Sequence, residues 1–345
     1  MDQPFEYSSY VTGKHFVGRR QDCASLADLL AGGRNVVLYE APKTGKTSLV
    51  EQTLLNLKQK GVSLKVARLN LLTVRTEAEF LRRLSTELTG VSPEGECELS
   101  ETLSLPWKLA ADSGQKVVVF LSEFQNLDFT EDSYHLYKTF EAVLREHAED
   151  SNACYIMSGS KVNAMKEIFE HHKFFWRCAE HLPVSKVEDR EVVDHVIRGF
   201  LSSGKVIEND LLLSICERFE NNLWYINHFI SICDTLTRGY ILQPVLIDAM
   251  SMMIAVHEPR FTAMMNDLTT FQVGLLEAVV DGHKHFSTSD VIRKYGLNSS
   301  ANVRRLKDAL CKKEIISFNE EDEPYFLDPL FKYWVTKYFF GKVEA

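Results

Sequence analysis

The stretch that most constrains the fold runs from residue 35 to residue 60 and reads NVVLYEAPKTGKTSLVEQTLLNLKQK. A short apolar run leads into a polar turn that ends in Gly45-Lys46-Thr47, and leucines at near-helical spacing follow at once. This order predicts a strand, a phosphate-binding loop and a helix, because loop N–H groups and the positive end of a helix attract phosphate. In such a loop Gly45 lets the backbone approach closely, Lys46 reaches the β- and γ-phosphates, and the Thr47 hydroxyl binds Mg²⁺.

The motif matches only the second half of G-x-x-x-x-G-K-[ST], because Glu40 stands at the first glycine position. The alternative interpretation is an ordinary strand-to-helix turn, in which a bare G-K-T also occurs. The flanking strand and helix favour a phosphate site. We therefore predict that a nucleotide binds to the loop through Pro42, Lys43, Thr44, Gly45, Lys46, Thr47 and Ser48.

A second candidate region follows the run KVVVFL at 116–121, which is apolar on both faces as buried parallel strands require. A Mg²⁺-nucleotide enzyme needs an acidic pair at the carboxyl end of such a strand. Here Glu123 is the predicted catalytic base, and Ser122 stands where the first acid would be. The Ser122 hydroxyl is predicted to hold a metal-bound water without adding negative charge. The alternative is that Glu123 is simply a solvated residue after a strand.

Two further candidates lie later in the same region. The predicted strand 153–157 ends in Ser-Gly-Ser, where Ser160 is predicted to contact the γ-phosphate or the attacking water, unless this is a plain turn. Arg177 lies in an aromatic stretch just before a fifth strand predicted at 182–187. Its guanidinium is predicted to complete the phosphate site within one chain or across a subunit boundary of a homo-oligomer. The alternative is a surface arginine.

Near the N-terminus, Phe16, Gly18 and Arg19 precede the first strand. We expect them to wrap the base of the nucleotide, although this segment is equally compatible with the start of a packing helix.

The composition is that of a globular protein with two or three domains, since 345 residues exceed one ordinary core. The first residues lack the pattern of a secretory signal, and no apolar run reaches the roughly 18 residues that span a bilayer. Seven scattered cysteines without a C-x-x-C pair indicate reduced thiols. We therefore expect a cytoplasmic protein without a membrane partner.

The pattern changes twice along the chain. Only helices are predicted after the fifth strand, at 188–202, 208–219, 223–237 and 243–254. From about 257, helices followed by a β-hairpin predict a winged helix. The segment 271–316 holds eight Lys/Arg and five Asp/Glu. Arg304, Arg305 and Lys307 could therefore enter a DNA groove, but the acidic turn at 320–323 favours packing or a protein partner over DNA.

Taken together, FVGRR, APKTGKTSL, EFQNL, YIMSGS and DPLFKYW resemble the archaeal-type P-loop ATPases of the STAND branch of AAA+-related proteins. The resemblance covers nearly the whole chain. It implies an α/β core at 1–187 with a five-stranded parallel sheet of the ASCE type, in strand order 5-1-4-3-2. It also implies a helical lid at 188–256 and a winged-helix domain at 257–345. ATP and Mg²⁺ would bind to Lys46 and Thr47, with Glu123 as the base.

The sequence departs from that family at Ser122, where an aspartate is usual, and at Asn221-Asn222-Leu223, where the lid usually has Gly-x-Pro. The first departure removes one charge from the Mg²⁺ site. We therefore expect an ATP-binding protein that acts as a nucleotide-gated switch with weak or conditional ATPase activity. The alternatives are a pseudo-ATPase scaffold and a winged-helix regulator that binds DNA or a protein partner.

Overall fold

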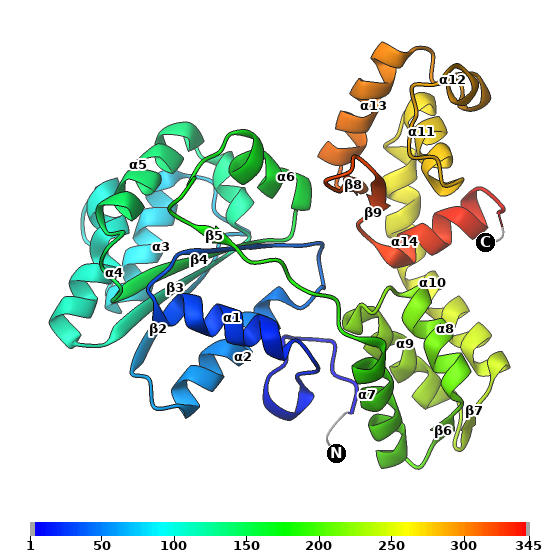
Figure 1. The fold of residues 1–345 in the computed structure, drawn as a ribbon, viewed down its shortest axis with the longest axis horizontal. Helices are drawn as coiled ribbons and strands as arrows, with labels where there is room; N and C mark the ends of the chain where they lie inside the picture. The colour runs from blue at the N-terminus through cyan, green and yellow to red at the C-terminus, as the bar shows by residue number, and fades with distance from the viewer. Residues whose placement is uncertain (1–3, 343–345) are drawn as a thin grey trace. The chain divides into compact units, whose positions relative to one another are not determined.

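The computed structural model describes residues 4–342, which form two compact units. One unit comprises Tyr10–Ser185, and the other comprises the N-terminal segment up to Ser9 together with the chain from Lys186 onward. Both are drawn in Figure 1. Among the described residues, no helix is both long enough and apolar enough to cross a membrane.

The unit Tyr10–Ser185 is built on a five-stranded parallel sheet in the order β2-β3-β4-β1-β5, which confirms the predicted order. The strands are β1 (Val36–Tyr39), β2 (Leu64–Asn70), β3 (Lys116–Ser122), β4 (Ala153–Gly159) and β5 (Glu180–His181). The helices are η1 (Gly13–His15), α1 (Arg20–Ala31), α2 (Lys46–Gln59), α3 (Glu77–Thr89), α4 (Leu99–Ser113), η2 (Phe124–Phe129), α5 (Ser133–Glu146), α6 (Val162–Lys166) and the π-helical turn η3 (Glu167–His171).

Helices cover both faces of this sheet, with α1 and α2 on one face and α3, α4 and α5 on the other (Figure 1). Alternate residues of each central strand, such as Val36 and Leu38 of β1, point into the core beneath α1 and α2. The intervening Val37 is also buried. Burial on both faces explains why β1, β3 and β4 are apolar throughout.

The fifth strand is shorter than predicted and begins earlier. The prediction placed it at 182–187, but β5 consists of Glu180 and His181, followed by one more hydrogen bond from Leu182 N to Val37 O. The strand pairing ends there, just before Pro183. The prediction of a strand at 182–187 was therefore wrong in its position.

The second unit begins with helices α7 (Asp189–Ser202), α8 (Asn209–Arg218), α9 (Leu223–Leu236) and α10 (Gln243–Asn266). The prediction that no strand interrupts them was wrong, because β6 (Val206–Ile207) and β7 (Tyr240–Ile241) pair in parallel. Two-residue strands are too short to leave a periodic signal in the sequence. Helix α10 also runs past the predicted helix end at 254, and the predicted boundary between 256 and 257 lies inside it.

The C-terminal part of this unit has the order of elements expected of a winged helix. It consists of α11 (Thr270–Val280), α12 (Ser289–Tyr295), α13 (Ser300–Lys312), the antiparallel hairpin β8 (Ile316–Phe318) and β9 (Pro324–Phe326), α14 (Pro329–Trp334) and the π-helical turn η4 (Val335–Phe339). Helix α11 packs against α12 and α13. The Thr269 side chain forms a capping box with Gln272 that starts α11.

The N-terminal segment belongs to this second unit although it precedes the first one in sequence. Phe5 is buried, and its ring packs edge-to-face against Phe200 of α7. A Cβ atom on Gly199 would lie 2.2 Å from the Phe5 ring, so only glycine leaves room for it. The Asn227 side chain donates to the backbone O of Glu6 over 2.9 Å, which ties the same segment to α9.

Candidate functional site

The phosphate loop connects the end of β1 at Tyr39 to the start of α2 at Lys46. Gly45, the residue before the helix, has φ 89°, a left-handed conformation that favours glycine. A Cβ atom at this position would lie 2.8 Å from Nη1 of Arg19. The left-handed conformation therefore favours glycine at the helix start, and any side chain here would also displace the Arg19 guanidinium.

The side chain of Lys46 turns back into the loop and is only 8% exposed. Its Nζ donates to the backbone O of Glu40 over 2.7 Å and to the backbone O of Ala41 over 2.8 Å. Burial lowers the pKa of Lys46 to about 8, although the carboxylates of Glu123 and Glu40 act in the opposite direction. The ammonium group is therefore buried, bound to neutral oxygens and close to two acids.

Glu40 stands where the phosphate loop usually has a glycine. Burial raises the pKa of its carboxyl group, and the nearby cations Lys46, Arg19 and Lys166 oppose that rise. The sequence analysis did not assign a role to Glu40 or to Lys166. Their proximity depends on α6 lying beside the end of β1, which no local pattern indicates.

Arg19, predicted to contact the nucleotide base, is hydrogen-bonded to the phosphate loop. Its Nη1 donates to the backbone O of Thr44 over 2.6 Å, and its Nε donates to the backbone O of Ser185 over 2.7 Å. Burial lowers the pKa of its guanidinium group. Gly18 has φ 68° and Phe16 packs against the core of the unit. The predicted contact of these residues with a base stays a prediction.

The chain just before α1 is also bound to the helix that follows the phosphate loop. The backbone N of Val11 donates to Oγ of Ser48 over 3.0 Å, and the backbone N of Gly13 donates to Oε1 of Gln52 over 2.6 Å. Ser48 was predicted to contact the nucleotide; its hydroxyl accepts a hydrogen bond from Val11, and the nucleotide contact stays a prediction. This contact was not predicted because it joins residues far apart in sequence.

Glu123 follows β3 directly and has φ 57°, a left-handed conformation that is uncommon for this residue type. Its Oε2 accepts hydrogen bonds from Oγ of Ser160 over 2.6 Å and from Nε2 of Gln125 over 2.8 Å. The sheet register pairs Ser122 with Ser158, so the polar ends of β3 and β4 lie side by side. The structure thus brings the predicted Glu123 and Ser160 together and adds Gln125.

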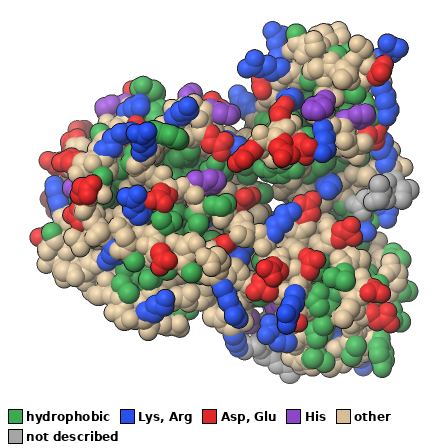
Figure 2. Space-filling model, in the orientation of Figure 1, with side chains coloured by type: hydrophobic (Ala, Val, Ile, Leu, Met, Phe, Trp, Pro, Cys, Tyr) green, Lys and Arg blue, Asp and Glu red, His purple; other side chains and the backbone are tan. Residues whose placement is uncertain are grey.

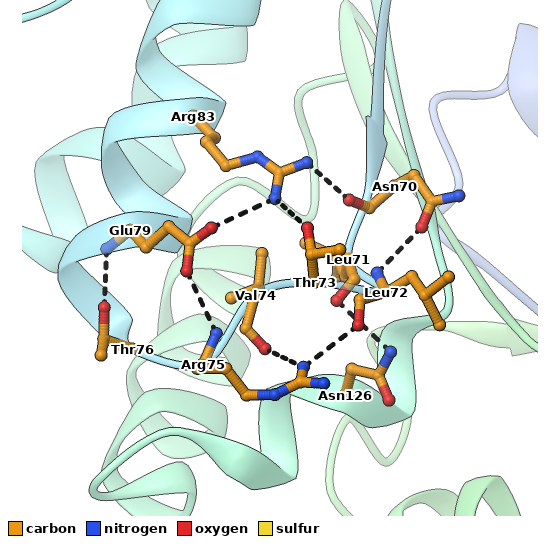
Figure 3. A network of polar contacts seen from close by, with 10 residues as sticks. All are labelled: Asn70, Leu71, Leu72, Thr73, Val74, Arg75, Thr76, Glu79, Arg83 and Asn126. Carbon is orange, nitrogen blue, oxygen red and sulfur yellow. Dashed lines mark hydrogen bonds and ion pairs between the residues drawn. The ribbon is translucent and has the colours of Figure 1, made fainter.

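The loop after β2 is hydrogen-bonded to the end of β3, next to Glu123. The backbone N of Leu71 donates to the backbone O of Ser122 over 2.9 Å, and Nδ2 of Asn126 donates to the backbone O of Leu71 over 3.3 Å. Figure 3 shows the loop held further by Arg83, which donates to the backbone O of Asn70 and to the Thr73 side chain. This network fixes the backbone on which Ser122 and Glu123 sit.

Arg177 is the one predicted site residue that lies at the opposite end of the sheet. The backbone O of the next residue, Cys178, accepts from the Asn35 side chain, and Glu180 pairs with Val36 at the start of β1. The phosphate loop follows the other end of this strand, about 10 Å away for four residues. A role of Arg177 in the phosphate site of its own chain therefore does not fit this structure.

The remaining groups fit a nucleotide and Mg²⁺. Neither the Thr47 hydroxyl nor the Ser122 hydroxyl makes a hydrogen bond to any other residue within 4–342. Mg²⁺ in nucleotide sites is held by few protein oxygens, by phosphate oxygens and by water. Two available hydroxyls, the buried Lys46 ammonium and the start of the 14-residue helix α2 match this chemistry.

The family model described as "Probable winged helix domain" matches residues 259–337. No curated protein matches the sequence. Among solved structures, a Walker-type ATPase of Pyrococcus abyssi is similar at 16% identity, with 96% of this chain and 99% of that chain covered and a TM-score of 0.71. The ORC2 protein of Aeropyrum pernix, solved as ADPNP-ADP complexes, is similar at 16% identity, with 95% and 94% covered and a TM-score of 0.63.

The ORC1 protein of Aeropyrum pernix, solved in complex with DNA, is similar at 14% identity, with 94% of each chain covered and a TM-score of 0.51. At these identities the similarity establishes the fold. The chain has the fold of the AAA+-related P-loop ATPases, with a winged helix at its C-terminal end. The fold expected from the sequence is thereby confirmed.

Proposed function

We propose that this chain is an ATP-binding protein that uses Mg²⁺ and acts as a nucleotide-gated switch with weak or conditional ATPase activity. The observation that carries this proposal is the Lys46 ammonium, buried in a loop between β1 and α2 and bound only to neutral oxygens. A buried cation of this kind is stabilised by a phosphate, which supplies the negative charge that backbone carbonyls lack.

In this site Lys46 would exchange its bonds to Glu40 and Ala41 for bonds to phosphate oxygens. Thr47 and Ser122 would hold Mg²⁺ directly or through water, and the ion would neutralise charge on the phosphates. Glu123 would take a proton from the attacking water. Ser160 and Gln125 orient its carboxylate, since both donate to Oε2.

The charge of the site supports weak rather than rapid turnover. Ser122 adds no negative charge where the mechanism uses an acid to hold the metal. We expect Ser122→Asp to lower the Mg²⁺ concentration for half-maximal phosphate release by about tenfold to 100-fold. Phosphate release that stays undetectable in both proteins, with ATP still bound, would favour the pseudo-ATPase scaffold instead.

The switch role is supported by how the two units are connected. The chain passes between them twice, at residues 9–10 and at 185–186. Arg19 binds both Thr44 of the phosphate loop and Ser185 at the second connection. Val11, next to the first connection, binds Ser48 in the first turn of α2. A change in the phosphate loop would therefore reach both connections through direct hydrogen bonds.

The substitution Arg19→Gln tests whether Arg19 links the phosphate loop to the connection at Ser185. The measurement is small-angle scattering of the whole protein with and without ATP. We expect ATP to change the radius of gyration of the wild type and of the control variant Arg20→Gln, an exposed arginine next in sequence. Arg19→Gln should bind ATP but lose most of this change. A full change in Arg19→Gln would exclude Arg19 as the connection.

A second candidate function is DNA contact through the winged helix. Arg304 and Arg305 are exposed on α13. Two of the four acids at 320–323 are paired with cations of the same unit, Asp322 with Lys307 and Glu323 with Lys284, which reduces the repulsion of phosphates by the wing. A duplex-binding assay in a salt series tests this, with Arg304→Gln/Arg305→Gln as the variant. Phosphate contacts predict affinity that falls steeply with salt and a shallower slope in the variant. A flat salt response would exclude DNA as the ligand.

A further inference from the structure

Glu40 is a charged residue of the phosphate loop that the proposed mechanism does not use. It follows β1 directly, at the position where such loops usually have a glycine. Its backbone O accepts from Nζ of Lys46 over 2.7 Å, so the residue is held next to the ammonium group that is proposed to bind phosphate. The Glu40 side chain is half-buried. A carboxyl group therefore lies beside the place where a triphosphate is proposed to bind.

The cations around Glu40 come from three segments of the chain. Burial raises the pKa of the Glu40 carboxyl group, and Lys46 opposes this rise more strongly than Arg19 and Lys166 do. Lys46 begins α2, Arg19 precedes α1, and Lys166 ends α6. Nearby cations favour the ionised form of a carboxylic acid. The three cations therefore keep negative charge on Glu40.

Helix α6, which carries Lys166, is held at the ends of β1 and β4 by two contacts. A Cβ atom on Gly159 would lie 2.4 Å from Cγ of Met165, so α6 packs directly on the last residue of β4. In the turn η3 that follows, the Glu170 carboxylate accepts a hydrogen bond from the hydroxyl of Tyr39, the last residue of β1. Lys166 lies between these two contacts in sequence. Its position at the carboxyl edge of the sheet is therefore fixed by the fold.

A second carboxylate interacts with the same ammonium group from another strand. Burial lowers the pKa of Lys46, and the carboxylates of Glu123 and Glu40 raise it, Glu123 more strongly than Glu40. Glu123 follows β3 and Glu40 follows β1, and β4 lies between these two strands. Two carboxylates therefore share one buried ammonium group, and the proposed mechanism uses only that of Glu123.

The wider surface carries charges of both signs. On the face drawn in Figure 2, acidic and basic side chains are interspersed over the unit Tyr10–Ser185. The chain as a whole has a net charge of −9. Long-range attraction of an anion is therefore weak, and the charges at the loop decide how a phosphate binds. Mg²⁺ neutralises charge on the phosphates that it bridges, so the same carboxylate repels a nucleotide less when the ion is bound.

We propose that Glu40 makes nucleotide binding depend on Mg²⁺, because its carboxylate repels a free triphosphate and the ion offsets that repulsion. This inference deepens the proposed function and rests on it, since both concern the same phosphate site. Without Glu40, Lys46 would attract the nucleotide with or without the ion. With Glu40 beside Lys46, the site selects the complex of nucleotide and Mg²⁺ over the nucleotide alone. Glu40 is thus a specificity-determining residue rather than a catalytic one.

The test measures the dissociation constant of ATP by calorimetry on the whole protein, once with Mg²⁺ and once with EDTA. A single charge within about 4–6 Å shifts the equilibrium of a neighbouring charged group by about tenfold or more. We therefore expect Glu40→Gln to bind ATP at least about tenfold more tightly than the wild type in EDTA. With Mg²⁺ the two proteins should differ by less than about threefold. Glu40→Asp, which keeps the charge, should behave as the wild type does under both conditions.

The matched control is Glu146→Gln, which removes an exposed glutamate at the C-terminal end of α5. This helix leads to the start of β4, at the edge of the sheet opposite the phosphate loop, so its ATP binding should match the wild type. Three results would overturn the inference: unchanged affinity of Glu40→Gln in EDTA, equal tightening with and without Mg²⁺, or the same change in Glu40→Asp as in Glu40→Gln. In each of these cases ATP still binds, and the proposed function stands. No ATP binding by the wild type or any variant with Mg²⁺ would instead reject the proposed function, and this inference with it.

Discussion

Replacing Lys46 with methionine removes a buried charge while keeping a long, unbranched side chain in the phosphate loop. In the folded protein the pKa of Lys46 is lowered from 10.5 to about 8, mainly by burial. The unfolded chain therefore binds more protons than the folded protein between these two values. By linkage, this lysine opposes folding most strongly below pH 8, and the stability of the wild type rises as the pH increases toward 10.5.

The size of this effect follows from the same pKa values. At pH 7 the shift corresponds to a destabilisation of about 3 kcal/mol, and at pH 9.5 to about 1.4 kcal/mol. The unfolding free energy of the wild type, relative to Lys46→Met, should therefore rise by about 2 kcal/mol from pH 7 to pH 9.5. The substitution also leaves the backbone carbonyl groups of Glu40 and Ala41 without their donor. This cost in stability is the same at both pH values, so it cancels in the difference.

The assay is urea unfolding at both pH values, followed by tryptophan fluorescence, to which Trp107, buried in the unit that contains the loop, contributes with the three other tryptophans. Lys58→Met, which removes an exposed lysine from the same helix, corrects for the loss of one positive charge. If the difference between wild type and Lys46→Met does not change with pH, or falls as the pH rises, Lys46 is not buried as the structure shows.

Three further substitutions test separate parts of the structure. Gly45→Ala should destabilise the protein by about 2 kcal/mol, because it forces a left-handed alanine against Arg19; an unchanged melting temperature would contradict this. Glu123→Gln should keep ATP binding and lower any measurable phosphate release by at least about 100-fold, whereas unchanged release would remove Glu123 as the base. Phe5→Ala should cost the second unit about 3–5 kcal/mol in urea unfolding, and a cost below about 1 kcal/mol would mean that its contact with Gly199 is not maintained.

The sequence predicted those parts of the fold that repeat over several residues. The apolar runs of β1, β3 and β4 are buried on both faces, so their composition alone identified them as parallel strands. The Thr76 side chain caps α3 by accepting from the backbone N of Glu79, and the sequence Thr-x-x-Glu is typical of such a helix start. These signals are local, and they determined the order of elements correctly.

The parts that could not be predicted depend on contacts between distant residues. β5 and the β6–β7 pair are two-residue strands whose pairing is set by the elements around them. The position of Arg177 depends on where the chain enters β5, and an aromatic neighbourhood gave no information about that. Gln125 could not be assigned to Glu123, because the bond requires the left-handed turn at Glu123 itself.

In the candidate site, too, residues marked by a local pattern could be predicted, and contacts between distant residues could not. Gly45, Lys46 and Glu123 could be selected because a motif or a strand end marks them. The contact of Arg19 with Thr44 and the burial of Glu40 beside Lys46 have no sequence signal, since both arise when α1 and α2 pack on one face of the sheet.

The most direct test of the central claim is ATP binding by calorimetry, in the presence and absence of Mg²⁺, with wild type and Lys46→Ala. We predict that the wild type binds ATP more tightly with Mg²⁺ and that Lys46→Ala shows no binding, because the buried ammonium is lost from the phosphate loop. Equal ATP affinity in the two proteins would contradict the account, since it would mean that nucleotide binds elsewhere.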